Sequence, residues 1–144
     1  MKKGIGMEMT DESKFVLLST RLMHEFGSEL CLYLEERGMS IPHYLIEFTT
    51  FANGEMLPQI PHTIRGQHVF FLHALQHPDP NTAVMMMLIA SDAIKRASAA
   101  GITLVVPFLS YLRQDRKDRP RVPISARLLA DLIESNRAVR GLIT

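Results

Sequence analysis

Residues 113–126 read Arg113-Gln114-Asp115-Arg116-Lys117-Asp118-Arg119-Pro120-Arg121-Val122-Pro123-Ile124-Ser125-Ala126. An apolar run at 103–108 precedes this stretch and an amphipathic run at 126–134 follows it. A strand, a charged loop and a helix in this order are the arrangement with which α/β sheets bind anionic ligands. Residues 113–121 hold five bases and two acids, a local excess of +3, whereas the whole chain carries only +1. Two prolines restrict the backbone. The stretch therefore predicts a strand, a rigid phosphate-binding loop and a helix.

Composition limits the classes of protein that fit this chain. At 144 residues, 47% of them hydrophobic, it is long enough for one globular domain with a core. No apolar run approaches 18 residues, which argues against a membrane span. The near-neutral charge argues against nucleic-acid binding. The single cysteine, Cys31, excludes an internal disulfide and favours a cytoplasmic location. Residues 1–14 form a polar leader, with acids where a signal peptide needs an apolar segment.

Apolar patterns predict strands that alternate with helices. We expect strands at 15–19, 44–51, 56–60, 67–75 and 103–108, a last strand beginning at Gly141, and helices at 24–36, 83–99 and 125–134. Asn53-Gly54 is a hairpin signal, and either Asn81 or Thr82 is expected to cap the second helix, which Gly101 would end. This order predicts a doubly wound, mainly parallel α/β sheet flanked by helices and truncated at its last strand.

The same residues carry a resemblance to a known family. Arg-Gln-Asp-Arg-Lys at 113–117, followed by Pro-Ile-Ser-Ala at 123–126, resembles the signature region of ribose-phosphate pyrophosphokinase, the phosphoribosyl pyrophosphate synthetase. Phe-Ala-Asn-Gly-Glu at 51–55 resembles the adenine-binding loop of that family, and 63–66 and 91–99 resemble further segments. The resemblance covers residues 15–144 in order, and it implies a phosphoribosyltransferase-like N-terminal domain without the C-terminal catalytic domain.

The resemblance implies a reaction and a set of site residues. The family transfers pyrophosphate from ATP to ribose 5-phosphate with Mg²⁺, giving phosphoribosyl pyrophosphate and AMP. Arg113 and Gln114 would contact ATP, while Phe51, Asn53, Gly54 and Glu55 would form an adenine-binding loop that reaches the site of a neighbouring subunit. Oligomerisation, through identical chains or full-length synthetase, would then be part of the site. Thr63 and Arg65 match positions near a regulatory phosphate site.

The parts that the resemblance does not cover also carry expectations. The metal-binding histidine, the catalytic loop and the ribose 5-phosphate loop of the family would lie beyond residue 144. We therefore assign no catalytic or metal-binding residue, and expect ATP binding without catalysis by this chain alone. Ribose 5-phosphate would bind only with the missing domain.

Alternative interpretations remain open. The chain could be a non-catalytic regulatory subunit that associates with full-length synthetase, or a nucleic-acid-binding module that uses its basic loop. The basic loop could also be a solvated surface, with Asp115 and Asp118 as partners of nearby arginines. We expect His73 to be a hydrogen-bonded core residue, and the methionines at 85–87 to serve packing. The other histidines show no metal-ligand spacing.

Overall fold

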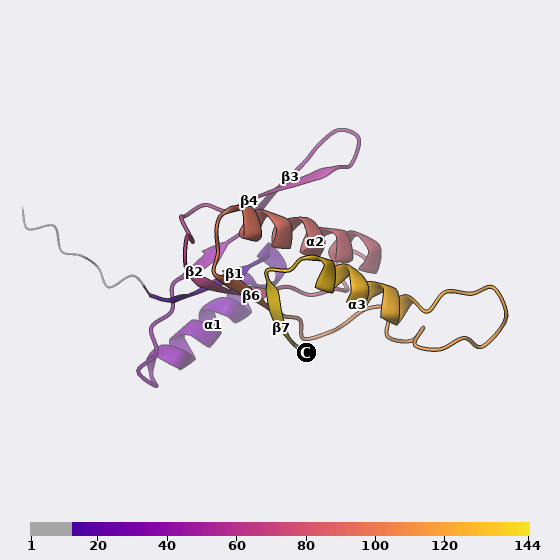
Figure 1. Ribbon diagram of the computed structural model, residues 1–144. Coiled ribbons are helices and arrows are strands. Elements are labelled where there is room, and N and C mark those ends of the chain that lie inside the picture. Colours follow the sequence, from indigo (N-terminus) through magenta and orange to yellow (C-terminus); the bar gives the residue numbers. More distant parts are fainter. Residues whose placement is uncertain (1–12) are drawn as a thin grey trace, which may run out of the picture.

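The computed structural model describes residues 13–144, and its centre is a parallel five-stranded sheet (Figure 1). Residues 1–12, most of the predicted polar leader, lie outside the described residues. Every neighbouring pair in the sheet is parallel, in the strand order β2-β1-β5-β6-β7. The five strands are β1 (Phe15–Ser19), β2 (His43–Leu45), β5 (His68–Leu72), β6 (Gly101–Val105) and β7 (Val139–Ile143). The predicted parallel sheet is confirmed, and β7 begins two residues earlier than expected.

Helices cover both faces of this sheet, as a doubly wound fold requires. The short 3-10 helix η1 (Arg21–Met23) leads into α1 (His24–Glu35), which lies on one face. The opposite face carries α2 (Pro80–Arg96) and α3 (Ser125–Ser135) (Figure 1). No helix within residues 13–144 is long and apolar enough to cross a lipid bilayer.

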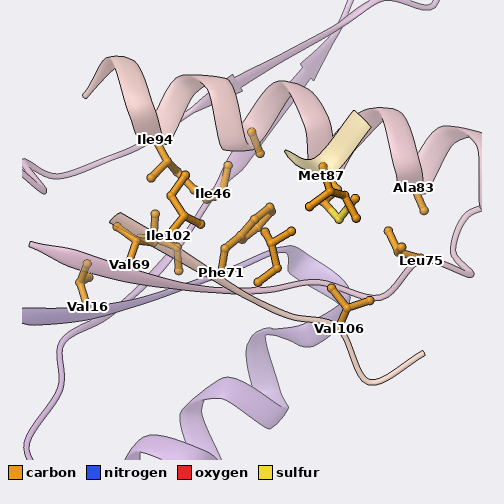
Figure 2. Close-up of a cluster of buried hydrophobic side chains, with 14 of the residues drawn as sticks. Val16, Ile46, Val69, Phe71, Leu75, Ala83, Met87, Ile94, Ile102 and Val106 are labelled. Atoms are coloured by element: carbon orange, nitrogen blue, oxygen red, sulfur yellow. The ribbon is translucent and has the colours of Figure 1, made fainter. Parts of the chain in front are cut away.

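The main core fills the space between the sheet and α2 (Figure 2). Strand residues that face α2 alternate along the sequence, so Phe71 from β5 and Ile102 from β6 meet Met87 and Ile94 from α2. All four side chains are fully buried. Burial of a side chain such as Phe71 contributes about 1.5–3 kcal/mol, and many such contributions hold α2 on the sheet. The expectation of packing is confirmed for Met87, whereas Met85 is half exposed.

A second, two-stranded sheet leaves the domain as a hairpin. It consists of β3 (Glu47–Thr50) and β4 (Met56–Gln59), paired antiparallel. The expected single strand at 44–51 is therefore wrong. Ile46 donates its backbone N–H to the carbonyl of Ser19, the last residue of β1, and buries its side chain in the core. Beyond Ile46 no strand of the main sheet continues alongside, so the chain turns away and pairs with β4 instead.

The ends of α2 differ from the expectation. Asp79 is its N-cap, because the Asp79 carboxylate accepts hydrogen bonds from the backbone N–H groups of Asn81 and Thr82. The prediction that Asn81 or Thr82 would cap the helix is thus wrong by two or three residues. At the other end the helix stops at Arg96, and Gly101 starts β6 instead of ending the helix. A Cβ at Gly101 would lie 3.0 Å from the Nδ1 atom of His68, so close strand packing explains this glycine.

Candidate functional site

A cavity of about 650 Å³ lies at the carboxyl ends of β6 and β7, beside the first turn of α2. The carboxyl edge of a parallel sheet is where α/β proteins hold their ligands. The walls combine apolar side chains with a few polar ones, the composition that is typical of small-molecule sites. The lining residues are Asp79, Pro80, Asn81, Thr144 and the continuous segment 107–114.

Gln114 is held by the beginning of α3. Its backbone N–H donates to the carbonyl of Tyr111 at 3.2 Å, and its own carbonyl accepts from the backbone N–H of Ala126 at 3.2 Å. The hydroxyl of Ser125 donates to Gln114 Oε1 at 2.5 Å. With Oε1 occupied, the amide NH₂ of Gln114 is the group left to meet a ligand.

Two hydroxyl groups tie the residues before Arg113 to the rest of the domain. The buried hydroxyl of Ser110 donates to the carbonyl of Leu75, which follows β5. The phenol of Tyr111 donates to Asn81 Oδ1 in the first turn of α2. Tyr111 takes a positive φ of 67°, a conformation that side chains other than glycine seldom adopt. These contacts set where Arg113 leaves the domain surface.

Only Arg113, of the five bases in the predicted phosphate loop, lines the cavity. The other four bases are exposed on a loop that extends past α3, away from the sheet (Figure 1). Within residues 13–144, no ion pair at 4 Å or less involves the charges of 113–121. The prediction that Asp115 and Asp118 pair with nearby arginines is therefore wrong in this structure. The loop extends into solvent, where an exposed ion pair contributes little to stability.

Asp79 is the acidic group of the cavity wall. It accepts a 2.6 Å hydrogen bond from the Thr82 hydroxyl as well as the two backbone bonds of the helix cap. The hydroxyl and backbone N–H of Thr82 lower the pKa of the Asp79 carboxyl, so it is ionised at neutral pH. The cavity thus presents one positive group, Arg113, and one negative group, Asp79, that is engaged in capping α2.

The predicted adenine-binding residues lie at the tip of the β3–β4 hairpin. Gly54 has a φ of +88°, and its N–H donates to the carbonyl of Phe51, while Asn53 Oδ1 accepts from the N–H of Glu55. The Phe51 ring is 49% exposed. None of these residues lines the 650 Å³ cavity, and the hairpin projects beyond the α2 side of the sheet (Figure 1). Within one chain, the two groups of predicted ATP ligands do not meet.

Thr63 and Arg65 form a third location. Both are exposed in the link between β4 and β5, on either side of the buried Ile64. Gly66, with φ of +74°, donates its N–H to the carbonyl of Ser98 and so ties this link to the end of α2. Neither Thr63 nor Arg65 lines the 650 Å³ cavity.

Several cavity residues had no assigned role in the sequence analysis. Tyr111 lies two residues before the signature region, and nothing in the sequence shows that its phenol reaches Asn81 thirty residues away. Asn81 carried a helix-start signal, which pointed to capping and gave no indication of a cavity wall, and Asp79 carried no assigned role. Ser110 carried no signal at all.

The histidines form no metal centre in the described part of the chain. Residues 13–144 contain no group of three or more His, Cys, Asp or Glu side chains placed to hold an ion. They therefore offer no all-protein cage for Mg²⁺, an ion that nucleotide sites usually hold with one or two carboxylates and the phosphates. His73 is a buried core residue with both ring nitrogens hydrogen-bonded, as expected. His24 and His43 stack against each other, and both contact the buried hydroxyl of Ser19. Burial and the neighbouring His24 lower the pKa of His43.

Comparison with known proteins gives consistent results. A family model described as the N-terminal domain of ribose phosphate pyrophosphokinase matches residues 15–136. Ribose-phosphate pyrophosphokinase of Aquifex aeolicus is 48% identical over 117 residues, which are 81% of this chain and 36% of the relative. The Streptomyces coelicolor enzyme of the same name is 40% identical over 139 residues, 95% of this chain and 40% of the relative.

Solved structures agree with the sequence relatives. The crystal structure of phosphoribosylpyrophosphate synthetase from Mycobacterium smegmatis superimposes with a TM-score of 0.76 at 37% identity, covering 90% of this chain and 41% of that one. A hypoxanthine-guanine phosphoribosyl transferase of L. donovani, 13% identical with a TM-score of 0.55, shares the fold. The chain spans about two fifths of the length of these synthetases. By the match over residues 15–136, it belongs to the family of the ribose-phosphate pyrophosphokinase N-terminal domain.

Proposed function

We propose that this chain provides the ATP-binding half of a ribose-phosphate pyrophosphokinase, acting in the cytoplasm. The complete reaction would transfer pyrophosphate from ATP, with Mg²⁺, to ribose 5-phosphate, giving phosphoribosyl pyrophosphate and AMP. The observation that supports this most directly is the placement of Arg113 and Gln114 on the wall of a 650 Å³ cavity at the strand ends. Membership of the family supports the same proposal.

Each of the two residues would have a separate task at the nucleotide. Arg113 would donate charge-assisted hydrogen bonds to ATP, and such bonds are about twice as strong as neutral ones. Gln114 would donate through its amide NH₂, because Ser125 already occupies Oε1. Both tasks concern positioning and charge neutralisation, which account for most of the catalysis of phosphoryl transfer.

The hairpin would complete the site of a neighbouring subunit. Phe51 is half exposed and would stack on adenine, while Asn53 and Glu55 would bond to the edge of the base. Gly54 gives the turn its shape. The separation of this tip from the cavity within one chain supports contact between subunits, in a homo-oligomer or in an assembly with full-length synthetase.

Catalysis would need groups that residues 13–144 do not offer. No catalytic residue and no magnesium ligand is assigned among these residues, which hold no group of three or more metal-ligating side chains. Ribose 5-phosphate would require the remaining part of the synthetase. Thr63 and Arg65 would bind the phosphate of an effector. Under this proposal residues 15–144 form the N-terminal domain and bind ATP without turnover.

A second candidate is a non-catalytic subunit that associates with full-length synthetase. The same separation of hairpin and cavity favours it, because both surfaces would be offered to a partner. The two candidates differ in whether the cavity of this chain itself binds nucleotide.

Calorimetric titration of the 144-residue chain with ATP and Mg²⁺ tests the proposal. We expect saturable binding that Arg113→Ala removes, while Arg119→Ala, in the same loop but outside the cavity, retains it. Light scattering would give the size of the assembly in each sample. A folded chain without ATP binding would reject the proposal and favour the non-catalytic subunit.

A further inference from the structure

The sheet contains a second place where ligands are expected. β1 and β5 are neighbouring parallel strands, but the chain leaves them toward opposite faces of the sheet. Helix α1 follows β1 on one face, and α2 follows β5 on the other. This is a topological switch point, and in open α/β sheets the diverging loops leave a crevice there. Neither Arg113 nor Gln114 lies at this position.

A cavity of about 350 Å³ occupies this crevice. Thr20 and Arg21 directly follow β1, and His73 and His77 come from the loop after β5. Ile46 lies between β2 and β3, and Glu47 is the first residue of β3. It shares no lining residue with the 650 Å³ cavity. Its volume is at the small end of the range for ligand sites, which suits a compact metabolite better than a nucleotide.

A buried pair of polar side chains forms one wall. His73 Nε2 lies 2.9 Å from the carbonyl of Ala83, which can only accept, so Nε2 carries the proton. Nδ1 must then accept from the hydroxyl of Thr20 at 3.1 Å. Burial lowers the pKa of His73 and keeps the ring neutral. With its proton engaged, the Thr20 oxygen is left as a hydrogen-bond acceptor for the cavity.

An ion pair lies on the outer wall of the same cavity. Arg21 Nη2 is 3.3 Å from Glu47 Oε2, and the two side chains are 80% and 57% exposed. Such an exposed pair contributes little to stability. A ligand that brings an anionic group to Arg21 and a cationic group to Glu47 can therefore break the pair at little cost in free energy. The remaining wall is apolar, with Ile46, Phe48 and Met86.

We propose that this crevice binds a free α-amino acid with an apolar side chain. Its carboxylate would pair with Arg21, its ammonium group would donate to Glu47 and Thr20, and its side chain would lie against Ile46 and Met86. The charges of Arg21 and Glu47 cancel, as the two charges of an amino acid do. A simple anion would have no positive group to offer Glu47 and would be repelled by its carboxylate. This proposal is independent of ATP binding, because the two cavities have different walls.

Titration of the isotope-labelled 144-residue chain with L-leucine and with L-methionine, followed by NMR, tests the charge pattern. We expect saturable shifts at Thr20, Glu47 and His73 with at least one of them. N-acetyl-leucine lacks the ammonium group and leucinamide lacks the carboxylate, so both should bind at least about tenfold more weakly. No saturation by either amino acid, or equal binding of N-acetyl-leucine, would overturn the proposal.

Matched variants assign the binding to the crevice. Arg21→Gln and Glu47→Gln should each weaken binding of the amino acid about tenfold or more. Arg96→Gln and Asp92→Asn remove an equally exposed ion pair on α2, at 78% and 50% exposure, and should leave binding unchanged. Titration of all four variants with ATP and Mg²⁺ should match wild type, which separates this site from the proposed ATP site. Equal losses in both pairs would reject the assignment.

Discussion

The two groups of residues proposed to bind ATP are held in very different ways. Residues 110–114 are hydrogen-bonded to three separate parts of the domain: Ser110 donates to Leu75, Tyr111 donates to Asn81, and Gln114 accepts from Ser125. The hairpin tip at Phe51 is shaped by bonds within its own turn. The first group is therefore tied to the body of the domain, whereas the second is held by contacts within a projecting turn. This contrast predicts where substitutions affect the fold and where they affect only assembly.

The largest expected effect comes from mixing two inactive variants. Arg113→Ala removes the cavity ligand and Phe51→Ala removes the stacking ring, so neither chain alone should bind ATP tightly. If the hairpin serves the cavity of a neighbour, a mixed assembly contains some sites with both residues intact. Calorimetry on the mixture should then show binding that neither variant shows alone. Absence of recovery, with subunit exchange verified by mass spectrometry, would contradict a site shared between chains.

Ser110→Ala should reduce the stability of the fold itself. It leaves the buried carbonyl of Leu75 without its donor, a loss that costs about 1–3 kcal/mol in the free energy of unfolding. Asn53→Ala at the hairpin tip is the matched change, since it removes the side-chain oxygen that accepts from the backbone N–H of Glu55. Because Asn53 is exposed, that change should cost no more than about 0.5 kcal/mol. Urea unfolding of both variants measures the difference, and equal costs would refute the contrast.

Tyr111→Phe should weaken ATP binding without removing it. The change deletes one hydroxyl and its bond to Asn81, worth about 1 kcal/mol, so we expect roughly a fivefold rise in the dissociation constant. Tyr33→Phe, on the exposed side of α1, is the control. Calorimetry gives both constants. An unchanged constant in Tyr111→Phe would show that the phenol does not position Arg113.

The smallest effect is a dependence of stability on pH. Burial lowers the pKa of His73 and of His43 in the folded chain below the ordinary value of 6.5. Just below pH 6.5 the unfolded chain therefore binds more protons than the folded chain. The free energy of unfolding should keep its highest value above that pH and decrease as the pH is lowered. Thermal unfolding between pH 5 and pH 8 would record this slope.

Substitution of the histidines shows whether they cause the slope. His73→Gln and His43→Gln should each flatten the dependence, whatever they do to stability at neutral pH. His62→Gln, an exposed histidine, should leave it unchanged. A slope that survives in the double variant His43→Gln/His73→Gln would assign the effect to other groups.

Much of the fold follows from local patterns, and the failures have identifiable causes. Apolar runs predicted β1 and β5 because parallel strands are buried on both faces, and Asn53-Gly54 predicted the hairpin. The break at Ile46 was missed, because it depends on where β1 ends in the sheet. The cap at Asp79 was missed because Asp, Asn and Thr are all good caps, and three candidates within four residues cannot be separated by preference alone.

The sequence identified some residues of the candidate site but not how they are arranged in space. Arg113 does line a cavity at the strand ends, as its position after an apolar run suggested. The other bases of the loop do not, because a loop's charge composition does not show which way each side chain faces. The bond from Tyr111 to Asn81 joins residues thirty positions apart, and only the packing of α2 brings them together.

The length of helix α2 has a consequence for the oligomer proposed above. Its seventeen residues make a rod about 26 Å long. One end holds the cavity wall through Asp79 and Asn81, and its length packs against β4 at the base of the hairpin. The length of α2 therefore sets the distance between the cavity and the base of the hairpin. If the hairpin serves the cavity of a neighbouring chain, as proposed above, the two chains must match that distance, and a change that shortens or bends α2 would prevent the match.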